Sequence, residues 1–477
     1  MKKLSARKRC ALIIGAVLLA IYLIVSVIFW FTGMPKIFFR YKVKEDNTIS
    51  IDYYSGFFPL LRIPDKIDGL PVTELDWWLN EYNGENYKEK RNYLAAFTVA
   101  VHIPDSVEIL RTNAFNGFSR LTFVNIPSSL RSTENDVFAN TNVYKLVFPE
   151  GITEIGVSYE DDTLSYKSFS FSYMKHLRKV VFPESLKKIG HNAFTNCTRL
   201  RKVTLPEGLE EIEYGAFQES GLTKINIPKN LKKIGGCIFR QTPFEKKLEK
   251  KTDGDFIIFN GDIIYKYIGK DENVIIPGNI TSICDRAFWD RTVKSVTISE
   301  GVKNVGDAFE YSKVEKIELP DTVEGNDLLI INCPYLKEIR LPANTTKLHS
   351  YAFKNCYSLE NIVLPEGITE IDDYAFNWCT SLSKIKLPKG LTKIGRCVFW
   401  YCQNLKDIEI PEGVTEIESG AFAFCDSLER IVIPESVTYI GSEAFKNCTS
   451  LKEVVIKGDP VIEEDAFKGC ELLENKP

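Results

Sequence analysis

Apolar residues recur at a fixed spacing along the C-terminal half of the chain. Phenylalanine, cysteine and proline each return every 23 positions, at Phe353, Phe376, Phe399, Phe422 and Phe445, at Cys333, Cys356, Cys379, Cys402, Cys425 and Cys448, and at Pro342, Pro365, Pro388, Pro411 and Pro434. A fixed period between about 20 and 50 residues is typical of a solenoid, in which each repeat forms one coil that stacks on its neighbours. The pattern therefore predicts a chain that grows by adding coils rather than separate domains.

The coil at residues 359–380 shows how each repeat is built. Ile362 and Leu364 alternate with polar or exposed positions, which predicts a short strand with one buried face. Pro365 lacks a backbone donor and ends the strand, and the later apolar positions turn the chain back over the same core. A single coil buries too few side chains to offset the entropy of ordering it. We therefore expect coils stacked about 4.8 Å apart, with equal positions of successive repeats as neighbours.

The same pattern extends toward the N-terminus. We predict a β-rich solenoid of about sixteen 23-residue coils over residues 61–470, followed by a C-terminal tail at 471–477. Proline, or serine in its place, marks the earlier coils at Pro64, Pro104, Pro127, Pro149, Pro183, Pro206, Pro228, Pro277, Ser299 and Pro320. Three coils carry insertions, at 77–91, at 157–172 and at about 240–273.

The third insertion is predicted to contain a hairpin. Asn260–Gly261 separates the apolar runs 256–259 and 262–265, and this dipeptide is the strongest short hairpin signal. We expect the hairpin to protrude from the solenoid and to serve as a contact surface. A second hairpin, within residues 35–60, is expected to cover the first coil, because an open end would expose apolar core and a free strand edge.

The first 34 residues have a separate character. Residues 11–31 are all apolar or small, and this run of 21 positions is long enough to cross a hydrocarbon core of about 30 Å. We interpret 1–10 as a basic cytoplasmic tail and 11–33 as an uncleaved transmembrane signal anchor. The alternative is a long signal peptide that is cut near Thr32–Gly33. The basic tail predicts a single-pass protein of the cell membrane with a cytoplasmic N-terminus and extracellular repeats, and Cys10 is a candidate for acylation.

Composition and motifs argue against catalysis and nucleic-acid binding. The net charge of -4 and the pI near 5.9 lack the basic field of a general nucleic-acid binder. The chain has no G-x-S-x-G, P-loop or H-E-x-x-H motif, and none of its four histidines belongs to a catalytic signature. We therefore expect no enzyme, no cofactor and no metal site. We interpret the repeated cysteines as buried reduced thiols rather than as disulfides or zinc ligands.

The repeat sequence is similar to a known family. Residues 410–425 and 433–448 both read I-P-x-x-V-T-x-I-x-x-x-A-F-x-x-C, and residues 63–73 have a common first-coil form. Over about 61–470 the chain resembles the BspA-type leucine-rich repeat family, found mainly in surface proteins of bacteria and in some protozoan parasites. The resemblance implies a leucine-rich repeat solenoid that is displayed at the surface as an adhesin or as a binder of host or matrix proteins.

One position on the predicted strand face carries an unusual run of charge. It is the residue before the first inward apolar residue, and it is lysine in four successive coils, at Lys145, Lys179, Lys202 and Lys224. Like charges stacked about 5 Å apart destabilise a sheet, so structure alone does not favour this arrangement. One hypothesis is a patch for an acidic protein, a wall polymer or a sulfated glycan. The alternative is a solvated face relieved by nearby glutamates. From Lys384 onward the same position alternates in sign, which predicts cross-strand ion pairs.

A second candidate surface is aromatic. Trp378, Tyr401 and Phe424 precede the cysteine in three successive coils, with Trp400 beside them. Stacking between coils without a ligand explains this pattern, and a platform for carbohydrate or protein is the alternative.

We expect the chain to bind an extracellular protein or glycan without chemistry. A passive structural or self-associating scaffold of the cell envelope is the alternative.

Overall fold

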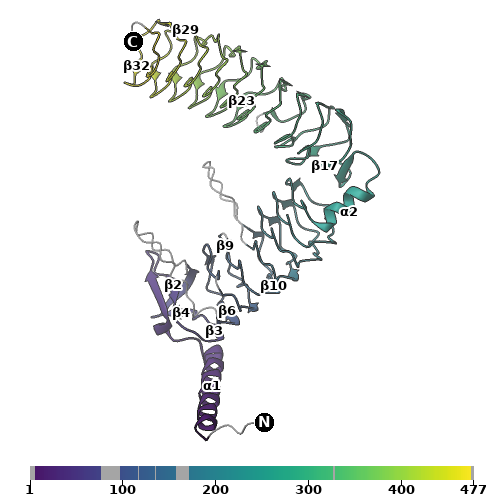
Figure 1. The fold of residues 1–477 in the computed structure, drawn as a ribbon, viewed down its shortest axis with the longest axis vertical. Helices are drawn as coiled ribbons and strands as arrows, with labels where there is room; N and C mark the ends of the chain where they lie inside the picture. Colours follow the sequence, from purple (N-terminus) through teal and green to yellow (C-terminus); the bar gives the residue numbers. More distant parts are fainter. Residues whose placement is uncertain are drawn as a thin grey trace. The chain divides into compact units, whose positions relative to one another are not determined.

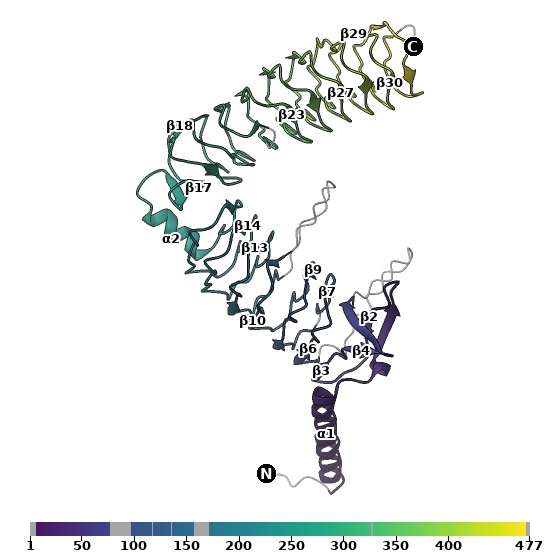
Figure 2. The ribbon, with the colours of Figure 1, turned by 180° about the vertical axis from the view of Figure 1, so that it is seen from behind.

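A computed structural model describes residues 6–76, 97–116, 118–134, 136–156, 171–325 and 328–473. Across these residues the chain forms about sixteen stacked coils preceded by one apolar helix, which confirms the predicted solenoid. Its contacts divide the chain into two compact units, Met1–Lys250 and Lys251–Pro477, and each unit shows its coils as successive rungs (Figures 1 and 2). The insertion at 77–91 lies outside the described residues, as does most of the one at 157–172.

The first unit begins with a long helix and a short 3-10 helix, α1 (Ala6–Thr32) and η1 (Lys36–Phe38), and ends in α2 (Pro243–Lys251). Its strands are β1 (Phe39–Val43), β2 (Ile49–Tyr54), β3 (Leu60–Arg62), β4 (Lys66–Ile67), β5 (Leu70–Leu75), β6 (Ala100–His102), β7 (Ile109–Leu110), β8 (Phe123–Val124), β9 (Ser132–Thr133), β10 (Lys145–Val147), β11 (Glu154–Ile155), β12 (Lys179–Val181), β13 (Lys188–Ile189), β14 (Glu211–Ile212) and β15 (Lys233–Ile234). Strands of successive coils pair in parallel, as in β10 with β12 and β13 with β14. The β1–β2 pair is antiparallel, and β2 joins the solenoid through a parallel pairing with β5.

The second unit repeats the same plan. Its strands are β16 (Phe256–Phe259), β17 (Ile263–Tyr267), β18 (Asn273–Ile276), β19 (Ser282–Ile283), β20 (Ser295–Ile298), β21 (Lys316–Glu318), β22 (Glu338–Arg340), β23 (Lys347–Leu348), β24 (Asn361–Ile362), β25 (Glu370–Ile371), β26 (Lys384–Ile385), β27 (Lys393–Ile394), β28 (Glu416–Ile417), β29 (Arg430–Ile433), β30 (Tyr439–Ile440), β31 (Glu453–Ile456) and β32 (Val461–Ile462). Strands of successive coils form several parallel ladders, the longest of which in this unit runs β23-β25-β27-β28-β30-β32.

A column of stacked phenylalanines forms the centre of the second unit. The ring of Phe376 is fully buried and lies 5.3 Å from Phe353 and 5.5 Å from Phe399, with interplanar angles of 7° and 2°. The column continues through Phe422 to Phe445, so the equal positions of successive coils are in contact as predicted. Because each coil contributes one ring to the interior, phenylalanine recurs every 23 residues along the sequence.

The repeated cysteines are buried beside this column as free thiols, as expected. Each thiol donates to a backbone carbonyl of the coil before it, for example from Cys379 Sγ to Phe353 O at 3.2 Å and from Cys402 Sγ to Phe376 O at 3.2 Å. Burial raises the pKa of the Cys197 thiol to about 12, so the protonated donor form is maintained at neutral pH. The cysteine position therefore serves packing and gives a second donor to a carbonyl that already accepts in its own turn, as Phe353 O does from the backbone N–H of Cys356 at 3.2 Å.

The third insertion differs from its expected form. Strands β16 and β17 form an antiparallel pair across Asn260–Gly261. The expectation of a protruding hairpin is nevertheless wrong for β17, which pairs in parallel with β19 and places Ile264 and Tyr267 in the core of the second unit. The apolar run after Asn260–Gly261, which suggested the second strand of a free hairpin, instead supplies the inward face of a coil.

Candidate functional site

The strand face is built from outward side chains on three-residue strands. In β10 the central Leu146 is buried, whereas Lys145 and Val147 point outward on either side of it. The same alternation in β12 exposes Lys179 and Val181. Two columns of side chains therefore follow the face from coil to coil, and the lysine column predicted from the sequence lies on it.

The four lysines are exposed and in register as two opposed pairs. Lys145 lies opposite Lys179, and Lys202 lies opposite Lys224, in both cases across parallel strands. Parallel neighbours are only about 4.8 Å apart along the sheet. Within the described part of the chain, none of the four lysines forms an ion pair. Relief by nearby glutamates, the alternative expected for this face, is therefore not found among these residues.

Elsewhere the equivalent position is neutralised. Lys384 Nζ lies 3.9 Å from Asp407 Oδ2, and Arg430 Nε lies 2.8 Å from Glu453 Oε2. This confirms the ion pairs predicted from the alternating signs. The comparison marks the four lysines as an exception within one repeating architecture.

A shallow depression of about 260 Å³ adjoins the first lysine pair. It is lined by residues that sequence reasoning did not select, namely Asn142, Tyr144, His176, Arg178 and Arg199. Arg199 Nη1 donates to His176 Nδ1 at 3.3 Å and so links two successive coils. The available signal was the basic residue directly before the lysine in two coils, Arg178 and Arg201.

These residues together form one exposed basic region, which we call the basic strand face: Lys145, Arg178, Lys179, Arg199, Arg201, Lys202 and Lys224. Tyr144, Val147 and Val181 are also exposed beside it. The region can therefore attract an anion over several coils and also contact apolar groups of the same partner.

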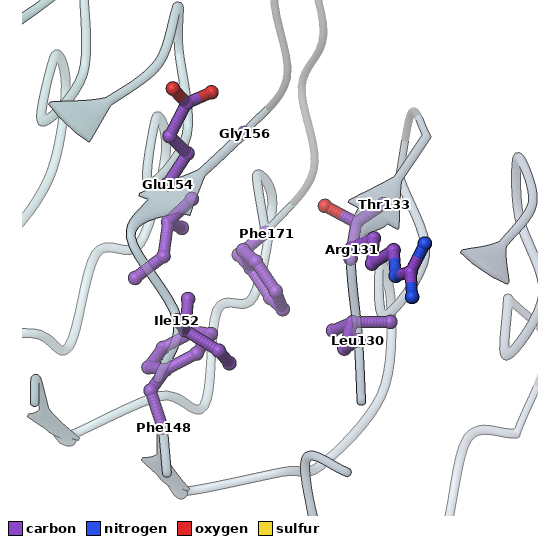
Figure 3. Close-up of a pocket in the computed structure, with 9 residues that line it drawn as sticks. Leu130, Arg131, Thr133, Phe148, Ile152, Glu154, Gly156 and Phe171 are labelled. Atoms are coloured by element: carbon purple, nitrogen blue, oxygen red, sulfur yellow. The ribbon is translucent and has the colours of Figure 1, made fainter. Parts of the chain in front are cut away.

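A second depression is too small for a ligand. It lies between the coils of β9 and β11, where Phe171 is flanked by Leu130 on one side and by Ile152 and Phe148 on the other (Figure 3). Its free volume is about 10 Å³, roughly the space of one water molecule. We assign it to packing at a break between two strand ladders.

The predicted aromatic residues form a closed stack. The ring of Tyr401 lies 4.1 Å from Trp378 and 4.3 Å from Phe424, nearly parallel to both. Trp400 lies beside them, 6.2 Å from Tyr401, and its indole N–H has no hydrogen-bond partner among the described residues. Because the ring faces cover one another, mainly ring edges remain for a partner. The geometry favours stacking between coils over a flat sugar platform.

The stack occupies a backbone position that disfavours large side chains. Trp378, Tyr401 and Phe424 have φ of 62°, 61° and 61°, in the left-handed region. Other coils place asparagine there, such as Asn355, and asparagine tolerates this conformation better than bulky residues do. The stacking contacts therefore offset a backbone cost in three successive coils.

Two further observations concern the membrane and metal ions. Helix α1 contains a 20-residue stretch, Ile13–Thr32, with mean hydropathy 2.8, so it is long and apolar enough to cross a membrane. Across the described residues, no group of three or more His, Cys, Asp or Glu side chains is arranged to hold a metal ion.

Several solved structures with similar folds are those of bacterial proteins. A leucine-rich cell surface protein from Faecalibacterium prausnitzii is 21% identical, with 89% of this chain and 95% of that chain covered and a TM-score of 0.30. A leucine-rich repeat protein from Bacteroides ovatus is 19% identical, with 87% of this chain and 98% of that chain covered and a TM-score of 0.32. The pneumococcal vaccine antigen PcpA is 17% identical, with 89% of this chain and 96% of that chain covered and a TM-score of 0.34. No curated protein matches the chain.

The family comparison is decisive for the repeat. Six copies of the BspA type leucine rich repeat region match residues 96–160, 164–249, 261–373 and 346–474. These matches span well over half of the chain and coincide with the stacked coils described above. The chain belongs to the BspA-type leucine-rich repeat family.

Proposed function

We propose that this protein is held in the cell membrane by α1, with its N-terminus in the cytoplasm and its coils outside, and that it binds an acidic protein or glycan without catalysing a reaction. Membership of the family supports a role at the cell surface in adhesion or protein interaction. The length and hydropathy of α1 support the anchor. The basic tail before it supports the orientation.

The observation that carries the binding proposal is the unrelieved lysine register. In each of two pairs, one lysine faces another across adjacent strands, and neither has an ion partner among the described residues. The equivalent positions in later coils form ion pairs. Such an arrangement of lysines costs stability in the free protein. It is relieved when an anion lies along the face, which is the reason to assign this face to a ligand.

The test uses the full chain in lipid nanodiscs and two probes, a sulfated glycan (heparin) and poly-L-glutamate. We expect at least one probe to bind at low salt and to dissociate at about 1 M salt, where the Debye length falls to about 3 Å. Serine at all four positions, Lys145, Lys179, Lys202 and Lys224, should abolish this binding.

The matched control removes the same charge from the same unit. Serine replaces Lys187, Lys229, Lys232 and Lys233, of which Lys187, Lys232 and Lys233 pair with Glu210 or Glu211. Equal loss of binding in both variants would show that only overall charge matters, and the site assignment would fail. Binding of neither probe by the unmodified protein would favour a passive envelope scaffold.

A further inference from the structure

An apolar surface lies beside α1 in the first unit. One face of the helix, formed by Tyr22, Ser26, Phe29 and Trp30, packs against the folded domain rather than facing outward. The ring of Tyr22 stacks on Phe57 at 5.6 Å and 5°. The loop that supplies Phe57 belongs to an uncharged segment from Tyr53 to Leu61.

The position of this contact along the helix determines its depth in a membrane. The apolar stretch Ile13–Thr32 has 20 residues, and at about 1.5 Å per residue it is about as long as the hydrocarbon core is thick. Tyr22 lies ten residues before Thr32, which corresponds to about 15 Å along the helix axis. This is half the thickness of the core, so if α1 spans the bilayer, the loop that stacks on Tyr22 extends through the outer leaflet to about the middle of the membrane.

The carbonyl groups at the tip of the loop are suited to that environment. Outside helices and barrels, chain segments enter a membrane only where their polar groups are satisfied by the protein. The Phe57 carbonyl accepts from the Tyr22 hydroxyl, and the Phe58 carbonyl accepts from Thr98 Oγ1 at 3.1 Å. The Pro59 carbonyl accepts from the backbone N–H of Val99 at 2.7 Å and from that of Ala100 at 3.0 Å. Three successive carbonyls are therefore bonded inside the protein.

Exposed apolar side chains surround this loop. Phe57, Val99 and Phe123 are exposed, as is Phe97, whose ring centre lies 5.5 Å from the guanidinium carbon of Arg120. They are linked through the structure: Val99 bonds to the loop, and Phe123 lies 6.5 Å from Trp30 of α1 and opposite Ala100 in the ladder. The patch is thus continuous with the apolar surface of the helix, which identifies its occupant as lipid rather than a separate protein.

We propose that the loop Ser55–Pro59, together with Phe97, Val99 and Phe123, inserts into the outer leaflet around α1 and forms a membrane seat. The inference rests on the proposed membrane anchor. The seat fixes the first coils against the bilayer, so the solenoid does not swing freely on the segment between α1 and β1. Only the membrane seat enters the bilayer. Lys36 and Asp68 form an ion pair that must stay in water, and this limits how far the first unit inserts.

The test measures the depth of single spin labels on the full chain in nanodiscs. Cys10 is first replaced by serine, and the other eleven cysteines are buried. Labels are then placed on cysteine at Val17 in α1, at Phe57 in the seat, and at Val363, which is 82% exposed on the second unit. The readout at each label is the ratio of its accessibility to oxygen, which concentrates in lipid, to its accessibility to a water-soluble nickel chelate.

We expect the ratio at Val17 and at Phe57 to exceed the ratio at Val363 several-fold. A lipid value at Val17 with an aqueous value at Phe57 would overturn the seat and leave the anchor intact. An aqueous value at Val17 would overturn the anchor and the seat together. Phe97→Cys provides a second seat position, so local disruption caused by changing Phe57 cannot decide the result alone.

Discussion

Reversing one charge in the lysine register should stabilise the protein while it weakens ligand binding. In Lys179→Glu the new carboxylate lies opposite Lys145, so a like-charged pair becomes an opposite-charged pair. The reverse change is available in the same unit at Lys233, which lies opposite Glu211 with Nζ 3.0 Å from Oε1. Lys233→Glu therefore turns an attractive pair into a repulsive one with the same substitution.

The size of the effect follows from cross-strand pairing. Removing a like-charged contact and adding an opposite-charged one each contribute about 0.2–1 kcal/mol, so Lys179→Glu should gain about 0.4–2 kcal/mol. Lys233→Glu should lose a similar amount. Because every 1.4 kcal/mol is tenfold in an equilibrium constant, these values correspond to about two-fold to thirty-fold changes in local opening.

Amide hydrogen exchange followed by mass spectrometry measures this opening at β10 and β12 for the first variant and at β14 and β15 for the second. Exchange should slow in Lys179→Glu and accelerate in Lys233→Glu at low salt, and both differences should shrink at about 1 M salt. Faster exchange in Lys179→Glu would refute the claim that the lysine register costs stability. The lysine pairs would then be a stable feature of the free protein and would not mark a ligand site.

Three further predictions concern the core, the aromatic stack and an ion pair. Phe376→Ala should lower the free energy of unfolding by about 3–5 kcal/mol in denaturant titrations, because it leaves a cavity between two stacked rings; a loss below about 1 kcal/mol would contradict the continuous column. Tyr401→Asn should destabilise less than Tyr401→Ala in the same titrations, because asparagine tolerates φ of 61°; the opposite order would show that the left-handed backbone conformation does not govern this position. Burial would raise the pKa of Glu213, but hydrogen bonds from His191 and Lys188 hold this pKa at about 2. The stability from this lowered pKa is present above the ordinary pKa near 4.5 and is lost as pH falls toward 2. Glu213→Gln should therefore make the free energy of unfolding less dependent on pH in this range. An unchanged pH dependence would contradict the stabilising role of Glu213.

The repeat could be predicted because burial leaves a periodic record. Phe353 and Phe376 occupy the same point of successive coils, so their spacing gives the coil length, and the contact between their rings follows from stacking. The strand register of Lys145 and Lys179 followed from the same alignment even though an insertion separates their coils. One-dimensional order of this kind is recoverable from sequence because each coil contacts mainly its neighbours.

Features that depend on contacts outside the repeat were not predicted. The Asn260–Gly261 turn is local and was found, whereas the pairing of β17 with β19 is set by tertiary packing that no turn signal encodes. The depression beside the lysines joins His176 and Arg199 from different coils, where neither residue stands out in sequence. The contact of Phe57 with Tyr22 spans 35 positions and follows no period.

The column of free thiols affects how long the folded protein persists in an oxidising medium. Outside the cytoplasm, thiols face oxidants that join them into disulfides. Folded coils exclude oxidants from the thiols of Cys379 and Cys402, and burial raises the pKa of both, which keeps them from becoming reactive thiolates. Once a stretch of coils opens, several thiols spaced 23 residues apart become available together, and cross-links formed between them block restacking. Unfolding in an oxidising medium is thus a one-way step, and the lifetime of the protein there is set by its opening rate rather than by its equilibrium stability.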